Sequence, residues 1–172
     1  MKYVALLRGI NVGGKRKVEM KKLKVVFESL GCSDVRTYLN SGNVIFSSSS
    51  PLSEKKTEQK LLATFGFEIP LVITTQLQIK KIAKSIPSSW QNDSLHQAYV
   101  AYLCKSADSP SSIKKLPIKP EYIDARYVPG AIIWCVERKN YYKSGIHKLI
   151  ECELYQQITT RNVNTARKLA QL

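Results

Sequence analysis

The sequence predicts an α+β protein of two subdomains: a ferredoxin-like split β-α-β-β-α-β unit, then a related antiparallel sheet with helices. Three observations support this fold class. Short apolar runs alternate with segments of helical period along the 172 residues. The turn sequences Asn40-Ser41-Gly42-Asn43 and Pro129-Gly130 each join two β-prone runs. Residues 87–96 are polar and aperiodic, so we expect subdomains at 1–86 and 97–172 with 87–96 connecting them.

The first half supplies the split order directly. The expected strands are residues 3–8, 35–39, 44–47 and 67–74. Apolar residues at helical spacing predict one helix that ends at Gly31 and a second that Ser53 caps and Gly66 ends. Pro70 lacks an N–H, so the last strand is expected at a sheet edge.

The second half is expected to read β-α-β-β-α-α. A helix from Thr75 to Pro87 comes before it. The expected strands are residues 98–104, 122–128 and 131–137. Ser109 and Pro110 predict the start of one helix, apolar positions at 146, 149, 150 and 154 predict another, and Asn162 is expected to cap the last.

The composition favours some classes of function and disfavours others. Lys and Arg exceed Asp and Glu by 27 to 13, a net charge of +14 that favours polyanionic partners or is a solvated lysine-rich surface. No apolar run is long enough to span a bilayer and no export signal is visible, so we expect a cytoplasmic protein with no membrane contact. Its four cysteines form no CxxC pair and its histidines number two, so we expect free thiols, no metal site and no cofactor.

The basic loop after the first strand is the leading candidate site. Gly9-x-x-x-x-Gly14-Lys15 satisfies most of a phosphate-binding loop, but Arg16 stands where Ser or Thr would hold magnesium. The next helix is also expected to begin too late to cradle a phosphate. Nucleotide hydrolysis is therefore disfavoured. Two interpretations remain: the loop binds an anion, or it is a structural turn whose glycines only permit the bend. The candidate anion-binding residues are Gly13, Gly14, Lys15, Arg16 and Lys17.

Topology brings a second loop to the first. In the split sheet the first and third strands are antiparallel neighbours, so the 40–43 turn should lie beside the glycine loop. Polar anchors would then converge at one end of the sheet: Arg8, Asn11, Asn40, Ser41 and Asn43. RNA recognition by base stacking places aromatic residues on the third strand. The corresponding positions here fall near Asn43 and Ile45, which are not aromatic, so this mode is disfavoured.

Two candidates lie in the second half. Lys148 follows Gly145 near an expected helix start, where an anion could bind, and His147 beside it has no catalytic partner visible in the sequence. Arg161 is the functional candidate in Thr159-Thr160-Arg161-Asn162, which is otherwise expected to be a capping turn.

These motifs together carry a family resemblance. They are residues 8–14 (RGINVGG), Tyr38 with residues 41–44 (SGNV), Gly145 with Lys148-Leu149, and residues 159–162 (TTRN) with 167–170. The chain resembles a bacterial family classed as a domain of unknown function, which implies an α+β fold of two subdomains and no known activity. It departs from the family pattern at Val163, where tryptophan is usual, and at Ile146 and His147, where arginine and serine are usual.

Three functional hypotheses follow. The first is a binding protein for a polyanion or phosphate-bearing ligand, nucleic acid included, that uses residues 8–17. The second is an enzyme or sensor acting on a small anionic metabolite at loops 8–17 and 40–43. In the third, the motifs are purely structural and hold the fold together. Neither the reaction nor the oligomeric state can be read from the sequence.

Overall fold

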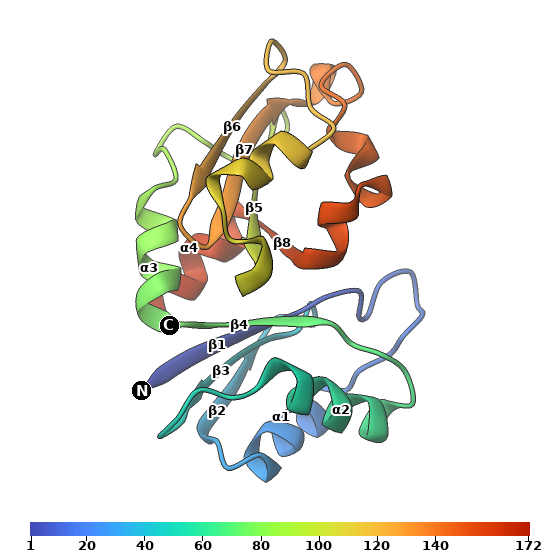
Figure 1. Ribbon diagram of the computed structural model, residues 1–172, viewed down its shortest axis with the longest axis vertical. Coiled ribbons are helices and arrows are strands. Elements are labelled where there is room, and N and C mark those ends of the chain that lie inside the picture. The colour runs from blue at the N-terminus through green and yellow to red at the C-terminus, as the bar shows by residue number, and fades with distance from the viewer. The chain divides into compact units, whose positions relative to one another are not determined.

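The computed structural model describes residues 1–172 and divides into two compact units, Met1–Gln76 and Leu77–Leu172 (Figure 1). The strands are β1 (Lys2–Leu7), β2 (Ser33–Tyr38), β3 (Asn43–Ser47), β4 (Leu71–Thr75), β5 (His96–Leu103), β6 (Ile123–Val128), β7 (Ala131–Glu137) and β8 (Ile158–Asn162). The α-helices are α1 (Met20–Ser29), α2 (Glu54–Phe65), α3 (Gln76–Lys84) and α4 (Val163–Gln171). Short 3₁₀ segments are η1 (Lys105–Ala107), η2 (Pro110–Lys115), η3 (Arg138–Asn140), η4 (Ile146–Glu151) and η5 (Glu153–Gln157).

The first unit has the predicted ferredoxin-like arrangement. Its sheet has the order β2-β3-β1-β4, and every neighbouring pair is antiparallel. Helices α1 and α2 follow β1 and β3 in the chain and complete the split β-α-β-β-α-β order. Figure 1 shows both helices on the same face of this sheet.

The core of the first unit follows from the two-residue period of a strand. Alternate residues of β1, Tyr3, Ala5 and Leu7, belong to one buried cluster with Leu23 and Phe27 of α1. Phe46 of β3 joins the same cluster. Period-2 strands pack against period-3.6 helices here, as the sequence pattern predicts.

β4 lies at the sheet edge, as expected, but it begins at Leu71, so Pro70 precedes the strand and the expected strand 67–74 is shorter. β4 pairs with β1 on one side, which leaves its outer N–H groups without a strand partner. Carboxylates from α2 accept two of these groups: Glu54 Oε1 lies 2.8 Å from the Ile73 nitrogen, and Glu58 Oε1 lies 3.4 Å from the Leu71 nitrogen. An edge blocked by charged side chains is a poor template for pairing with another chain.

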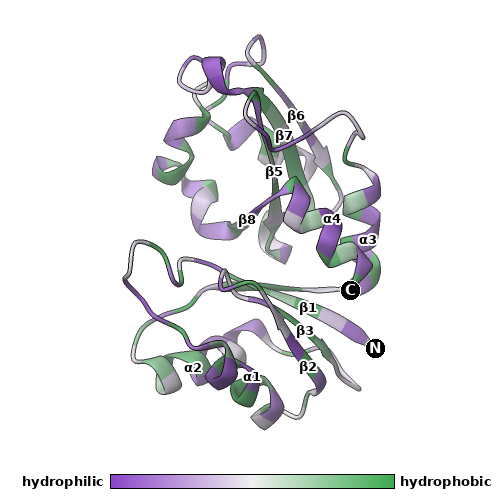
Figure 2. Cartoon of the chain, turned by 180° about the vertical axis from the view of Figure 1, so that it is seen from behind, coloured by the Kyte–Doolittle hydropathy of each residue, from purple (hydrophilic) through white to green (hydrophobic).

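The second unit repeats the strand order of the first. Its sheet has the order β6-β7-β5-β8, again wholly antiparallel, so both halves share the split topology. Strand β7 is coloured as hydrophobic over most of its length (Figure 2). One face of this sheet buries Ala101, Leu103, Ile132 and Trp134 in a single cluster.

Three expectations for this half were wrong. The helix expected to start at Ser109 and Pro110 is the short 3₁₀ segment η2, although Ser109 does cap it. Residues 146–154 form the 3₁₀ segments η4 and η5 and not an α-helix, because Cys152 adopts an extended backbone with φ −86° and ψ 149° that interrupts the helical turns. Residues 159–162 lie in β8 and are not a turn, since the edge of β5 offers them hydrogen-bond partners. The capping residue was right: Asn162 Oδ1 accepts from the Thr165 nitrogen at 2.8 Å.

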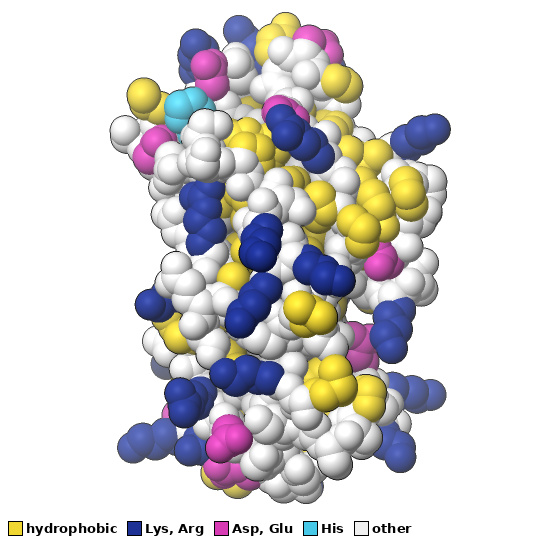
Figure 3. Space-filling view, turned by 90° about the vertical axis from the view of Figure 1, so that its left-hand side faces the viewer, with side chains coloured by type: hydrophobic (Ala, Val, Ile, Leu, Met, Phe, Trp, Pro, Cys, Tyr) yellow, Lys and Arg dark blue, Asp and Glu magenta, His cyan; other side chains and the backbone are white.

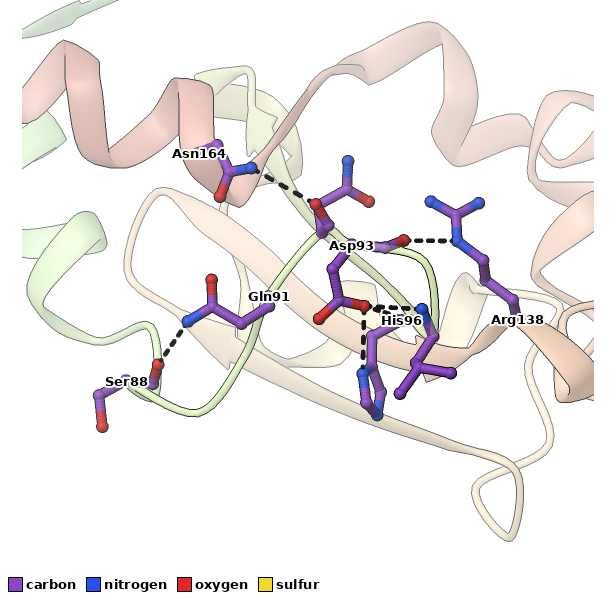
Figure 4. Close-up of polar contacts among 8 residues, drawn as sticks. Ser88, Gln91, Asp93, His96, Arg138 and Asn164 are labelled. Atoms are coloured by element: carbon purple, nitrogen blue, oxygen red, sulfur yellow. Dashed lines mark hydrogen bonds and ion pairs between the residues drawn. The ribbon is translucent and has the colours of Figure 1, made fainter.

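The unit boundary falls earlier along the chain than the sequence suggests. The compact units divide after Gln76, so α3 groups with the second unit. The expected connecting segment 87–96 is bound to that unit (Figure 4). Arg138 Nε donates to the Asp93 carbonyl at 2.7 Å, and Asn164 Nδ2 lies 3.5 Å from the Asn92 carbonyl. Polar composition here reflects loop hydrogen bonding and not a free linker.

Candidate functional site

The tip of the glycine loop is a tight turn. Val12 and Lys15 form an isolated antiparallel bridge, and the Lys15 nitrogen donates to the Val12 carbonyl at 3.1 Å. Gly13 and Gly14 between them have φ values of 58° and 73°. Positive φ at both central positions is the type I′ turn, which favours glycine. The two glycines are therefore explained by backbone conformation.

Asn11 holds the base of this loop closed. Its Oδ1 accepts from the Val18 nitrogen at 2.8 Å, and its Nδ2 donates to the Val18 carbonyl at 3.0 Å. The same Nδ2 donates to the Asn40 carbonyl at 2.8 Å. The expected proximity of the 8–17 and 40–43 loops is thus confirmed, and Asn11 makes the contact between them.

The 40–43 turn is packed, and its most buried amide faces inward. Asn43 is fully buried, and its Nδ2 donates to the Tyr38 carbonyl at 2.7 Å and to Ser41 Oγ at 3.1 Å. A Cβ at Gly42 would lie 2.7 Å from Ile10 Cδ1. The side-chain amide of Asn43, which was expected to anchor a ligand, therefore closes its own hairpin.

The basic side chains of the loop differ in their freedom. The Arg16 guanidinium lies 5.1 Å from the centre of the Phe67 ring and donates to the Glu68 carbonyl, so it is folded onto its own unit. Arg8 is half-buried beside the loop. Lys15 and Lys17 are exposed, which leaves their ammonium groups to the solvent.

A broad open depression lies beside this loop. Its volume is about 710 Å³, and its walls come from the glycine loop, the start of α1, Asn40 and the end of α2. Lys17 and Lys22 contribute its cations and Glu19 its carboxylate. Helix α1 begins at Met20 and its N-cap, Glu19, makes no side-chain capping hydrogen bond. The positive end of the helix dipole thus adds to the two lysines.

The two candidates of the second half occupy different surroundings. Lys148 is exposed on η4, next to a rigid turn: Gly145 has φ 82°, and a Cβ there would lie 2.0 Å from the Pro117 carbonyl oxygen. Arg161 is 8% exposed, on β8 opposite Val100. Burial lowers the pKa of Arg161 to about 10, with Tyr102 opposing that shift, so the guanidinium stays charged at neutral pH.

The second unit holds a depression that the sequence did not indicate. It has a volume of about 780 Å³ and is lined by residues of β5, β6 and β7 together with the segment around Trp90. His96 pairs with Glu137, and Cys135 lies opposite Ala98, so strand pairing brings His96 and Cys135 to one face of the sheet. No local motif announces this cluster, because it depends on the register between strands distant in the chain.

The electrostatics of this second depression do not favour covalent catalysis. Burial raises the pKa of the Cys135 thiol, and the carboxylates of Asp124, Asp93 and Glu137 raise it further, so the nucleophilic thiolate is disfavoured. Asp93 lies 3.4 Å from His96 Nδ1, but its carboxylate accepts the His96 and Leu95 backbone N–H groups, which lower its pKa (Figure 4). Asp93 is thus chiefly a turn-closing acceptor.

The structure shows neither a cluster of metal-ligating side chains nor a membrane-spanning helix. No group of three or more His, Cys, Asp or Glu side chains is arranged to hold a metal ion. None of the helices has the length and apolar character needed to cross a bilayer. The four cysteines, Cys32, Cys104, Cys135 and Cys152, are free.

Comparison with known proteins gives a family. Among solved structures the chain is similar to a conserved bacterial protein, SP0830, from Streptococcus pneumoniae, with a TM-score of 0.79 and 28% sequence identity, covering 99% of this chain and 97% of that chain. No match was found among curated proteins. A family model described as protein of unknown function (DUF1697) matches residues 1–134. Since that match spans more than half of the sequence, the chain belongs to the family of proteins of unknown function DUF1697.

Proposed function

We propose that this protein binds a phosphate-bearing ligand at the open depression beside the glycine loop. The observation that carries the proposal is the joint placement of Lys17, Lys22 and the uncapped start of α1 around one hollow. Ammonium groups and the free N–H groups of a helix start are both donors to phosphate oxygens. The sequence motif contributes by holding the loop in shape, and the lysines contribute the charge.

The strength of such a site can be bounded. A helix start stabilises a nearby anion by about 0.3–1 kcal/mol at an exposed position, and exposed ion pairs add about 0–1 kcal/mol each. Glu19 in the same lining opposes an anion. We therefore expect weak binding of a single phosphate and tighter binding of ligands with several phosphates, nucleic acid among them.

Binding is a better reading of this depression than catalysis. Its lining holds one carboxylate, Glu19, and one hydroxyl, Thr64, with no histidine or cysteine. General acid–base chemistry needs a proton donor and acceptor poised near a reacting group, and the lining does not pair two such groups. The enzyme or sensor alternative therefore has no specific observation in its favour. The expected cytoplasmic location stays a prediction.

The proposal is tested by titrating isotope-labelled protein with inorganic pyrophosphate at low ionic strength and following the backbone amide resonances. We expect shifts in the amides of Gly14, Met20, Lys21 and Lys22, which border the hollow or begin the helix. A ligand at about 100 times its dissociation constant should also stabilise the fold by about 2.7 kcal/mol in thermal unfolding.

Matched variants separate the site from general charge. Lys17→Gln with Lys22→Gln should abolish the shifts, whereas Lys56→Gln with Lys60→Gln removes two exposed lysines of α2 in the same unit and should leave them. Equal effects of the two pairs, or no amide shift at all, would refute the proposed site.

A further inference from the structure

The helices α3 and α4 of the second unit form a basic surface without acidic residues. Their exposed cations are Lys80, Lys81, Lys84 and Lys168. The stretches 76–92 and 154–172, which contain the two helices, include no Asp or Glu. Both helices lie on the same side of the second unit in the two ribbon views (Figures 1 and 2). Figure 3 looks onto the side where α3 lies and shows dark blue side chains there without magenta between them.

Packing on the inner sides of these helices directs the lysines outward. Ile79 and Ile82 of α3 are buried, as are Ala166 and Leu169 of α4. The side chain of Gln78 donates to the Pro129 carbonyl, which fixes α3 on the β6–β7 turn. With their apolar stripes facing inward, both helices present their remaining charged faces to solvent.

Hydrogen bonds tie α4 to the segment that follows α3. Arg167 Nη2 of α4 donates to the Pro87 carbonyl at 3.0 Å and to the Trp90 carbonyl at 2.9 Å. Pro87 follows Lys84, the last residue of α3, by three positions, and Lys168 is the neighbour of Arg167. Arg167 thus anchors the end of the α3 segment to α4, and Lys84 and Lys168 lie close in the chain to the two ends of this contact.

This surface carries charge repulsion that the protein does not relieve. Lys80 and Lys84 are four positions apart on α3, where like charges are destabilising by about 0.2–0.5 kcal/mol. In helix α1 a lysine at the same spacing has an acidic partner instead, since Lys24 Nζ lies 3.6 Å from Glu28 Oε1. An acid-free cluster of this kind is stabilised when an external polyanion approaches it.

We propose that the α3–α4 face binds the phosphate backbone of duplex DNA without reading its sequence. The helices contain no aromatic residue, so they offer no platform for stacking the bases of a single strand. Lysine ammonium groups neutralise phosphates as point charges and do not read base edges. This interface is separate from the depression of the first unit and does not depend on it.

The test is the salt dependence of binding to a fluorescently labelled DNA duplex, measured by anisotropy with the full chain. The variant is Lys80→Gln, Lys84→Gln and Lys168→Gln. Each lost phosphate contact lowers the slope of log K against log salt by about 0.9, so the slope should fall by about 2.7 and binding at about 0.1 M salt should weaken by about 100-fold or more. The control is Lys114→Gln, Lys115→Gln and Lys119→Gln, exposed lysines of the same unit with the same change in charge.

Several outcomes would overturn the interface. They are equal losses in the two triple variants, no duplex binding by the native chain at low salt, tighter binding of duplex RNA than of DNA, and binding of phosphatidylserine vesicles in place of DNA. Unchanged thermal unfolding of the triple variant shows that it is folded. That variant should also keep the pyrophosphate-induced amide shifts of the first unit, so the failure of one proposal is distinguishable from the failure of the other.

Discussion

Replacing Asn11 tests whether its side chain, more than the glycines, holds the 8–17 loop. Asn11→Ala removes three hydrogen bonds, two to the Val18 backbone and one to the Asn40 carbonyl. Each is worth about 1 kcal/mol net, and the exposed bond to Asn40 contributes the least, so we expect a loss of about 2–3 kcal/mol. Asn11 also has φ 55°, a left-handed conformation that costs alanine about 1 kcal/mol more.

A second substitution separates these two contributions. Asn11→Gly loses the same hydrogen bonds but tolerates positive φ, so it should be less destabilising than Asn11→Ala by about 1 kcal/mol. Urea unfolding gives both free energies. Hydrogen exchange at the Val18 amide, which donates to Asn11 Oδ1 at 2.8 Å, reports the local effect. An alanine variant that loses less than about 0.5 kcal/mol, or a Val18 amide that stays protected, would refute the reasoning.

Three further predictions concern other parts of the chain. Gly145→Ala should destabilise the fold by about 3 kcal/mol or more, since its Cβ would lie 2.0 Å from the Pro117 oxygen, whereas Gly13→Ala has open space around it and should cost about 1 kcal/mol. Denaturant unfolding compares the two variants, and similar losses of stability would contradict the clash. The His96 and Leu95 backbone N–H groups lower the pKa of Asp93, so its contribution to stability is present above the unfolded pKa of about 3.9 and is lost as pH falls through the lower folded pKa. Acid unfolding of the native chain and of Asp93→Asn checks this, and identical acid unfolding curves would count against it. Burial raises the pKa of the Cys32 and Cys135 thiols, so iodoacetamide should alkylate both more slowly than free cysteine at about pH 8. Mass spectrometry follows the modification, and rapid labelling of Cys135 would disprove a protonated thiol.

Local signals in the sequence predicted the first unit well. Gly66, with φ 79°, ends α2, and Ser53 Oγ accepts from the Lys56 nitrogen at the start of the same helix. β4 lies at a sheet edge and directly follows Pro70. These features depend on residues close in the chain, where propensity and capping act, so the sequence alone is sufficient to read them.

The second unit was read less well because its short segments depend on tertiary partners. Thr159 is β-branched and suits a strand, but the capping pattern at Asn162 predicts a turn; in the structure Thr159 and Arg161 of β8 pair with Tyr102 and Val100 of β5. Ile146 and Leu149 have helical spacing, but they lie in a 3₁₀ segment and pack into the sheet cluster. Pairing with β5 and burial against the sheet therefore decide between local signals that point in different directions.

The sequence by itself determined the α+β class, the converging 8–17 and 40–43 loops, and the basic charge of the chain. Topology rules suffice for the loops, because adjacency of the first and third strands is a property of the split order. Only the tertiary structure decided which polar residues are free: Asn11 and Asn43 are engaged in hydrogen bonds, while Lys17 and Lys22 border an open depression. A residue type states which bonds a side chain can make, but the partners that satisfy those bonds come from distant parts of the chain and are set by folding.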